Sequence, residues 1–218
     1  MKIAISGPAA AGKGTIARRF AVDAKIGYVD LGLLFRVGAF VLSTKKITSL
    51  EELPALLKSR EVIYKWNEGI ASVFLYSEDI TTALLSQEIA NQTSMLASSH
   101  NQQAILTEIS SFVLETFDGV ICDGRNAGTT ILQDADHKFF VTARLEERAR
   151  RRYLDVIARD KTVSFEEILR EINERDKRDA ERLENPSVIP SGAIILETDT
   201  RTVDESVQFM WDNIKKKS

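Results

Sequence analysis

Short apolar runs alternate with helix-like patterns along most of this chain of 218 residues. Five of the runs predict strands, at residues 2–6, 28–30, 119–123, 138–142 and 193–196. The runs at 119–123 and 138–142 show no alternation of apolar and polar residues, which is typical of parallel strands covered by helices on both faces. The pattern therefore predicts an α/β fold built on a five-stranded parallel sheet.

Apolar residues spaced three and four apart predict the helices between these strands. Ile16, Phe20 and Ala24 share one face of the first helix, and later helices are expected at 33–41 and 101–117. Three capping boxes predict further helix starts; they pair Ser49 with Glu52, Ser164 with Glu167, and Thr202 with Glu205. Pro54 leaves the start of the helix after Ser49 open.

Two segments depart from the alternation of strand and helix. Residues 61–66 and 72–77 read as an antiparallel hairpin, so we expect an inserted module over about 33–99. Residues 144–182 are densely charged and poor in large apolar residues, and we expect them to form a mobile helical lid over about 146–189. The remaining stretches, about 1–32, 100–145 and 190–218, would form the core of a single domain.

Composition excludes several classes of protein. The net charge is −3, so no overall positive field attracts the chain to nucleic acid or to an anionic membrane. Cys122 is the only cysteine, which excludes an internal disulfide and fits a reducing compartment. The first strand starts at residue 2, which leaves no room for a signal peptide, and no apolar run is long enough to span a bilayer. We expect a cytoplasmic protein.

The segment between the first strand and the first helix carries the strongest chemical signal. Its residues are Gly7, Pro8, Ala9, Ala10, Ala11, Gly12, Lys13, Gly14 and Thr15. Glycines let backbone N–H groups turn toward a polyphosphate, and the helix N-terminus adds its positive dipole end. Lys13 would serve the β- and γ-phosphates of a nucleoside triphosphate and Thr15 a magnesium ion. The Gly-Lys-Gly-Thr variant occurs in small-molecule kinases, whereas a glycine-rich turn with a chance lysine is the alternative.

Polar residues at strand ends give a second set of candidates. Asp123, Gly124, Arg125 and Asn126 follow a core strand, where ligands bind in open parallel sheets. Asp123 would hold magnesium or its water shell and Arg125 a phosphate, although a plain β-turn is the alternative. Asp30 ends another strand, and Arg36 lies on the helix after it.

Arginines are concentrated in the expected lid. Arg148, Arg151 and Arg152 lie on one helical segment, and Arg175, Arg178 and Arg182 share a face of the next. A solvated helix with exposed ion pairs is the alternative. Beside a phosphate-binding loop, however, a flap of arginines would surround the transferring phosphate and exclude water. Acidic residues outnumber basic ones within 164–184, which argues against nucleic acid.

These motifs together resemble bacterial cytidylate kinases over essentially the whole chain. The matching segments are 7–15, 30–36, 78–81, 87–91, 123–125 and 174–179. The resemblance implies a P-loop NTPase-type core with a monophosphate-binding insertion and a lid. It also implies a monomeric enzyme that transfers the γ-phosphate of ATP to CMP or dCMP with Mg²⁺.

The resemblance also implies roles for individual residues. Lys13 and Thr15 would match the ATP-phosphate and magnesium functions, and Arg148 and Arg151 in the lid would lie on the ATP side. The acceptor phosphate and the transfer would depend on Arg36, Arg125, Arg175 and Arg182, the sugar on Asp179, and the base on Ser94.

Four positions depart from the family pattern. Leu31 replaces the usual Ser or Thr, and Leu85 stands where an arginine is common. Gln103 and Asn126 replace an arginine and an aspartate that read the base. The phosphate-handling residues are retained, so the departures bear on the base. Two alternatives therefore stay open, a kinase that accepts UMP and a nucleotide sensor without turnover, and the retained arginines argue against the sensor.

Overall fold

The computed structural model describes residues 1–96, 100–157, 163–180 and 188–216 and contains a five-stranded sheet. The strand order is β2-β6-β1-β7-β8. The bounds are Lys2–Ser6 (β1), Gly27–Asp30 (β2), Val120–Asp123 (β6), His137–Thr142 (β7) and Ile194–Glu197 (β8). The pairs β2–β6, β1–β7 and β7–β8 are parallel, which confirms the predicted fold class.

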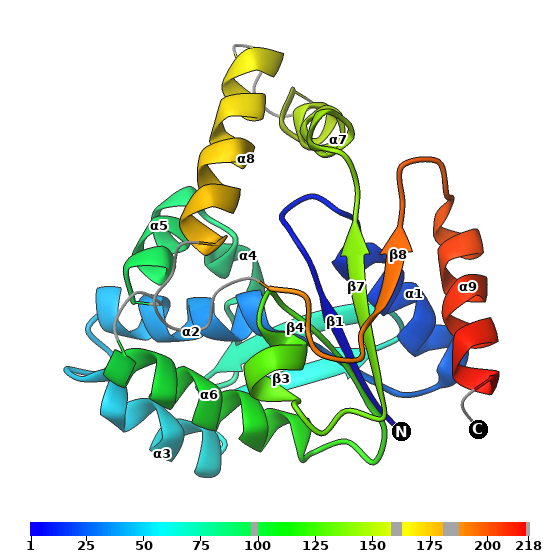
Figure 1. The fold of residues 1–218 in the computed structure, drawn as a ribbon. Coiled ribbons are helices and arrows are strands. Elements are labelled where there is room, and N and C mark those ends of the chain that lie inside the picture. Colours follow the sequence, from blue (N-terminus) through cyan, green and yellow to red (C-terminus); the bar gives the residue numbers. More distant parts are fainter. Residues whose placement is uncertain (97–99, 158–162, 181–187, 217–218) are drawn as a thin grey trace. The chain divides into compact units, whose positions relative to one another are not determined.

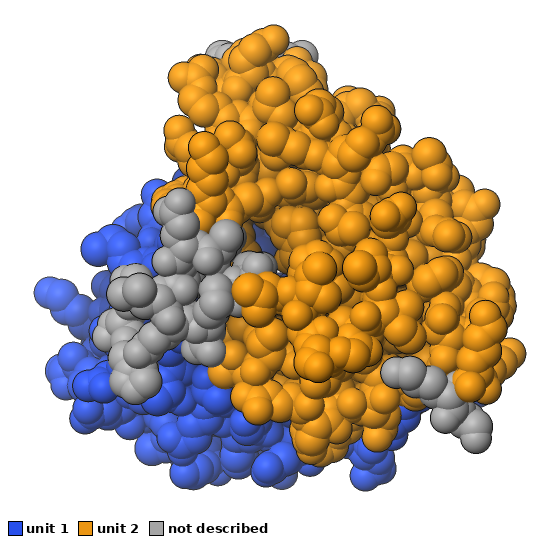
Figure 2. Space-filling view, in the orientation of Figure 1, with its two compact units in different colours: residues 1, 21–123 blue, residues 2–20, 124–218 orange. Residues whose placement is uncertain are grey.

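The chain divides into two compact units, coloured separately in Figure 2. One unit comprises residues 1 and 21–123, and the other comprises residues 2–20 and 124–218. This division differs from the expected core, insertion and lid, whose boundaries stay a prediction.

The first unit contains β2, β6 and the predicted hairpin. Strands β3 (Val62–Asn67) and β4 (Ile70–Leu75) pair antiparallel, and a two-residue strand β5 (Glu78–Asp79), which the sequence pattern did not predict, adds to β4. Its helices are α2 (Leu31–Ser43), η1 (Leu50–Glu52), α3 (Leu53–Lys58), α4 (Thr81–Leu84), α5 (Gln87–Leu96) and α6 (His100–Leu114).

The capping box at Ser49 is present and starts η1, a short 3₁₀ turn that continues into α3. The Glu52 carboxylate accepts hydrogen bonds from the backbone N–H groups of Thr48 and Ser49, which lower its pKa. Pro54 lies in the first turn of α3, where the lack of an N–H group costs nothing. The helix start predicted near Ser49 is therefore confirmed.

The second unit contains β1, β7 and β8 side by side (Figure 1). Its other elements are most of α1 (Lys13–Ala24), then η2 (Ala127–Ile131), α7 (Leu145–Ile157), α8 (Phe165–Ala180) and α9 (Val203–Lys215). Helices α1 and α9 pack together through Phe20 and Trp211, whose ring centroids are 4.6 Å apart, and Arg19 pairs with Asp204 at 3.2 Å. The predicted capping box of Thr202 and Glu205 begins α9.

Helices α7 and α8 have an apolar core of their own. Ala149, Ile168 and Ile172 are buried, and seven further residues pack on them: Ala10, Leu145, Tyr153, Val156, Val163, Phe165 and Leu169. The expectation that residues 144–182 are poor in large apolar anchors was therefore wrong for α7 and α8. These apolar residues recur every three or four positions between charged residues, so they form one continuous apolar face on each helix. The overall composition of the segment does not reveal this face.

None of the described helices is long and apolar enough to cross a membrane.

Replacing Ile168 by Ala should weaken the α7–α8 pair, because Ile168 is only 3% exposed within this core. We expect the free energy of opening of α8 amides, measured by hydrogen exchange, to fall by about 2–5 kcal/mol. Leu154→Ala on α7 is the control, since Leu154 is 54% exposed and its loss should change the same quantity by about 0.5 kcal/mol or less. Equal effects of the two substitutions would contradict a buried core between these helices.

Candidate active site

The segment of residues 7–15, here called the phosphate loop, connects β1 to α1. A Cβ atom added to Gly7, which has a φ of +141°, would lie 2.0 Å from the carbonyl oxygen of Val141 on β7. Gly12 has a φ of +91° and Ala10 a φ of +58°. Glycine is therefore required at Gly7 by the close approach of two backbones, and the loop reverses through left-handed residues before α1 begins at Lys13.

Side chains hold three carbonyl oxygens of the phosphate loop. The Lys13 Nζ donates to Pro8 at 2.8 Å, Arg148 donates to Ala9 at 3.1 Å, and the Thr198 Oγ1 donates to Ala11 at 3.0 Å. The C=O and N–H groups of a trans peptide point in opposite directions. A hydrogen bond that fixes the direction of one carbonyl group therefore also fixes the N–H group of the following residue, which points in the opposite direction. Such a set of oriented N–H groups next to a helix N-terminus can bind an anion.

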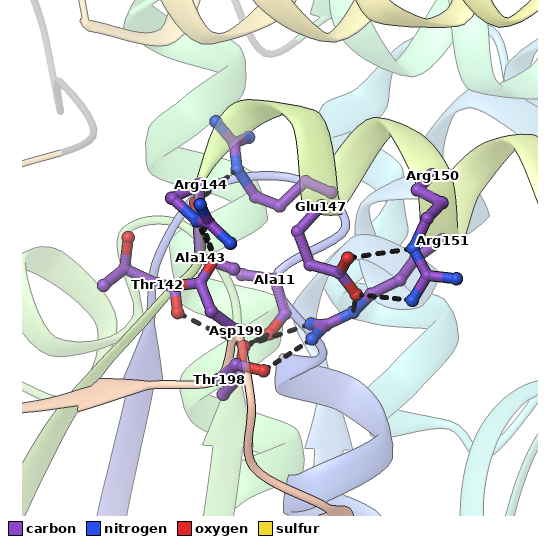
Figure 3. Close-up of polar contacts among 10 residues, drawn as sticks. Ala11, Thr142, Ala143, Arg144, Glu147, Arg150, Arg151, Thr198 and Asp199 are labelled. Atoms are coloured by element: carbon purple, nitrogen blue, oxygen red, sulfur yellow. Dashed lines mark hydrogen bonds and ion pairs between the residues drawn. The ribbon is translucent and has the colours of Figure 1, made fainter.

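Thr198, which follows β8, links the phosphate loop to α7 (Figure 3). The Arg151 guanidinium donates to the Thr198 Oγ1 at 3.1 Å and to its carbonyl oxygen at 2.5 Å. The Nε of Arg151 donates to Glu147 at 3.0 Å. Glu147 also accepts from Arg150, whose hydrogen bond lowers the pKa of Glu147, so this carboxylate stays ionised. Arg151 thus bonds protein groups of α7 and of the segment after β8, and its predicted contact with ATP stays a prediction.

Arg148 is buried and also contacts protein groups. Its Nε donates to the carbonyl oxygen of Ala143 at 3.0 Å, and its NH1 lies 2.6 Å from the Oδ2 of Asp176 on α8. Together with the bond to Ala9, these contacts join the phosphate loop, α7 and α8 through one side chain.

The remaining lid candidates lie on or after α8. Arg175 is exposed, and the Nε of Arg178 donates to the carbonyl oxygen of Glu174 at 3.4 Å. Asp179 belongs to α8, but its side chain lies outside the described part, and Arg182 lies outside the described residues altogether.

The carboxyl ends of β2 and β6 place two candidate carboxylates side by side. Asp30 and Asp123 are register partners in the parallel β2–β6 pair. The Asp30 Oδ1 accepts from the N–H of Leu33 at 3.0 Å and caps α2, while the buried Asp123 accepts from the Tyr28 hydroxyl at 3.4 Å. Arg36 on the capped helix donates to the carbonyl oxygen of Leu84 at 3.4 Å.

Two aromatic residues that sequence reasoning missed hold the two ends of β2, which is the terminal strand in the sheet order. The Tyr64 hydroxyl accepts from the N–H of Asp30 and donates to the carbonyl oxygen of Tyr28, both at 3.1 Å. The Trp66 Nε1 donates to the carbonyl oxygen of Ile26 at 3.2 Å. Burial raises the pKa of Tyr64 well above its usual range, so the hydroxyl keeps its proton. The only signal in the sequence was the two-residue spacing of these aromatics on β3.

Four candidates lie elsewhere in the fold. Ser94 is exposed on α5, Gln103 is buried on α6, and Arg125 and Asn126 are half-buried between β6 and η2. The Asn126 carbonyl oxygen accepts from the N–H of Thr130 at 2.9 Å, so this segment leads into η2 rather than ending as a plain β-turn.

Two of the positions that depart from the family pattern differ in burial. Leu31 is buried in the first turn of α2, whereas Leu85 is 59% exposed after α4.

Oxygen donors suited to magnesium are present in both units. Thr15 has an exposed position in the first turn of α1, and Asp123 supplies a buried carboxylate. Among the residues that the structure describes, no three His, Cys, Asp or Glu side chains are grouped to hold a metal.

A protein-family model and curated relatives point to the same family. The family model described as cytidylate kinase matches residues 3–216. The chain is 36% identical to the cytidylate kinase of Caldanaerobacter subterraneus subsp. tengcongensis, over 99% of this chain and 95% of that protein. It is 32% identical to the cytidylate kinase of Bacillus subtilis, over 100% and 98% of the two chains.

Solved structures support the fold. TT1252 from Thermus thermophilus matches with a TM-score of 0.52 at 18% identity, over 99% of this chain and 96% of that chain. Shikimate kinase from Bacteroides thetaiotaomicron matches with a TM-score of 0.50 at 14% identity, over 99% and 98%.

Tyr64→Phe should loosen the end of β2, because the substitution leaves the carbonyl oxygen of Tyr28 and the N–H of Asp30 without this partner. We expect a loss of about 1–3 kcal/mol in the free energy of unfolding, and faster hydrogen exchange at the Asp30 amide. Tyr76→Phe is the matched control, since Tyr76 is 50% exposed. Unchanged exchange at Asp30 in Tyr64→Phe would show that this hydroxyl does not hold the strand.

Proposed function

Because the chain belongs to the cytidylate kinase family and transfers the γ-phosphate of ATP to CMP or dCMP, we propose that the phosphate loop binds ATP and that residues after β2 and β6 bind the monophosphate. The products are CDP or dCDP and ADP. The observation that carries the proposal is the set of three side-chain hydrogen bonds to Pro8, Ala9 and Ala11, which orients the N–H groups of the loop for a polyphosphate.

On the donor side, Lys13 has a direct electrostatic role. Its ammonium group lies 2.8 Å from the Pro8 carbonyl oxygen, within the phosphate loop itself. The ammonium group has three N–H donors, so it can keep the bond to Pro8 and also donate to the β- and γ-phosphates, where both partners of the hydrogen bond are charged. Thr15 and Asp123 would hold Mg²⁺, which when bound neutralises charge on the ATP phosphates. Arg151 would lie beside the nucleotide at Gly12, since its NH1 is 3.8 Å from a Cβ built on that residue.

On the acceptor side, we assign the monophosphate to arginines from different elements. Arg36 is carried by the helix that Asp30 caps, and Arg125 follows β6. Arg175 and Arg182 would approach from the lid and stabilise the charge that spreads over the transferring phosphoryl oxygens. Asp179 would accept a hydrogen bond from the acceptor sugar. Closure of the lid would exclude water, which otherwise competes with CMP for the phosphoryl group.

The two alternative functions are not favoured. Relatives at 31–36% identity over nearly the whole chain are cytidylate kinases, which argues against a shifted acceptor or a sensor without turnover. We expect a monomer that works in the cytoplasm on its two nucleotides and binds no nucleic acid.

Lys13→Ala tests the donor assignment. Loss of the ammonium group should lower kcat by about 10²–10³-fold or more, as loss of one transition-state donor does in other enzymes. The melting temperature should stay unchanged, because Lys13 is only half-buried. Lys215→Ala, at the exposed end of α9, is the control and should keep full activity. A wild-type kcat in Lys13→Ala would refute the assignment.

The base-reading positions carry neutral amides. Gln103 is buried on α6, and Asn126 precedes η2. The family pattern has an arginine and an aspartate here, and the joint replacement leaves no unpaired buried charge. An amide both donates and accepts, so Asn126 can serve the 4-amino group of cytosine in one orientation and the 4-carbonyl group of uracil in the other. We propose that Ser94, Gln103 and Asn126 form a base site that discriminates less sharply.

CMP and dCMP should therefore remain the best acceptors, with UMP within about two orders of magnitude in kcat/KM. Coupled assays of ADP release with the three monophosphates measure this. Gln103→Arg with Asn126→Asp should widen the gap, whereas either substitution alone should impair all three substrates. Rejection of UMP by the wild-type enzyme by roughly 10⁵-fold, as in sites with fixed complementary partners, would contradict the amide argument.

A further inference from the structure

We propose that Arg148 is a positioning residue for phosphoryl transfer: it orients the peptide between Ala9 and Ala10 in the phosphate loop and, through Asp176, fixes the helix that carries Arg175. The inference rests on the proposed binding of ATP to residues 7–15. It assigns Arg148 a role through other protein groups, in place of the direct contact with ATP expected from the sequence.

The guanidinium of Arg148 is occupied by protein partners. The side chain is 7% exposed, and its Nε and NH1 atoms bond Ala143, Ala9 and Asp176 at 3.0, 3.1 and 2.6 Å. A buried cation is stable only where a carboxylate and further acceptors compensate for its lost hydration. The planar fork of arginine allows one side chain to satisfy acceptors in three directions, which a lysine ammonium on a flexible chain does less well.

The bond to Ala9 acts on the nucleotide side of the loop. The described chain has no cis peptide, so the N–H of Ala10 points away from the Ala9 carbonyl oxygen that Arg148 holds. Ala10 has a φ of +58°, a left-handed backbone conformation that is unfavourable for residues other than glycine. Its methyl group packs on the α7–α8 core of Ala149, Ile168 and Ile172. The lid helices thus hold this peptide by a hydrogen bond and an apolar contact, and these contacts keep its N–H available for a phosphate.

The bond to Asp176 acts on α8. Asp176 directly precedes Lys177 and follows Arg175, and neighbouring residues on a helix point about 100° apart. Asp176 faces α7 through Arg148, and Arg175 is exposed. The ion pair therefore fixes the rotation of α8 about its axis and with it the direction of Arg175. Arg148 would therefore orient both the N–H group of Ala10 and the guanidinium group of Arg175.

Four variants test the inference, each assayed for kcat, for KM with ATP and with CMP, and for melting temperature. Arg148→Lys keeps the positive charge but removes the planar guanidinium group. The kcat/KM for ATP should fall about 10–100-fold, and the KM for CMP should stay within about threefold of the wild-type value. Asp176→Asn leaves the Ala9 bond in place and should lower kcat about 5–20-fold with little change in KM for ATP. Arg170→Lys on the exposed face of α8 is the matched control and should behave as wild type.

The double variant Arg148→Met/Asp176→Leu separates positioning from stability. Replacement of a buried ion pair by apolar residues is often neutral for folding, so its melting temperature should return close to that of the wild type. Its kcat/KM for ATP should stay at least about tenfold low, because neither the Ala9 peptide nor α8 is aligned. This variant remains informative even where the single variants fold poorly.

Three results would overturn the inference. Recovery of both stability and activity in the double variant would show a purely structural pair. Full activity in Asp176→Asn with a raised KM for ATP in Arg148→Lys would show that Arg148 binds ATP directly. Wild-type kinetics in both single variants would show no role. Failure of the proposed function is separate, since it would appear as an active Lys13→Ala variant whatever the behaviour of Arg148.

Discussion

The close approach of the phosphate loop to β7 is the constraint on which the active-site geometry depends. A Cβ on Gly7 would lie 2.0 Å from the Val141 carbonyl oxygen, a distance that no side chain tolerates. Because Gly7 lacks that atom, the backbone leaves β1 against its parallel neighbour and reverses within a few residues into α1. That path brings the carbonyl oxygens of Ala9 and Ala11 within reach of Arg148 and Thr198. Those two side chains follow β7 and β8, so the parallel strands place the groups that orient the loop.

The strands and the phosphate loop were predictable because their signals are local. A run of apolar residues identifies a buried parallel strand, and glycines next to a lysine between strand and helix identify the loop without knowledge of the rest of the fold. Strand β5 has two residues and no apolar pattern, so only its pairing with β4 defines it. The apolar stripe of α7 and α8 was missed because charged residues dominate the composition, while Ile168 and Ile172 repeat at a helical spacing.

The sequence predicts candidate site residues, but it does not predict the contacts that they make in the fold. Asp30 and Asp123 were both expected at strand ends, yet their pairing depends on the adjacency of β2 and β6, which sequence patterns do not specify. Arg148 and Arg151 were expected near ATP because they lie in the segment predicted to form a lid. The protein atoms that these two arginines bond are set by the rotation of α7 about its axis and by the directions of the carbonyl groups in the phosphate loop. Tyr64 was missed because a tyrosine in a hairpin ordinarily serves as a packing residue, and its hydrogen bonds to β2 follow from the tertiary fold alone.

Both units use buried side chains to fix backbone groups near the proposed substrate sites. In one unit, Tyr64 holds the peptide groups around Asp30, which in turn caps the helix of Arg36. In the other, Arg148 holds Ala9 and Thr198 holds Ala11. Groups oriented before binding need no reorganisation when charge develops during transfer, which is the main source of electrostatic catalysis. None of these holding residues is a candidate for contact with the base. Gln103 and Asn126, the positions proposed to read the base, can therefore differ in chemistry without disturbing the contacts that orient the phosphate loop. This independence is consistent with a chain that keeps the expected phosphate-handling residues and carries two uncharged residues at the proposed base site.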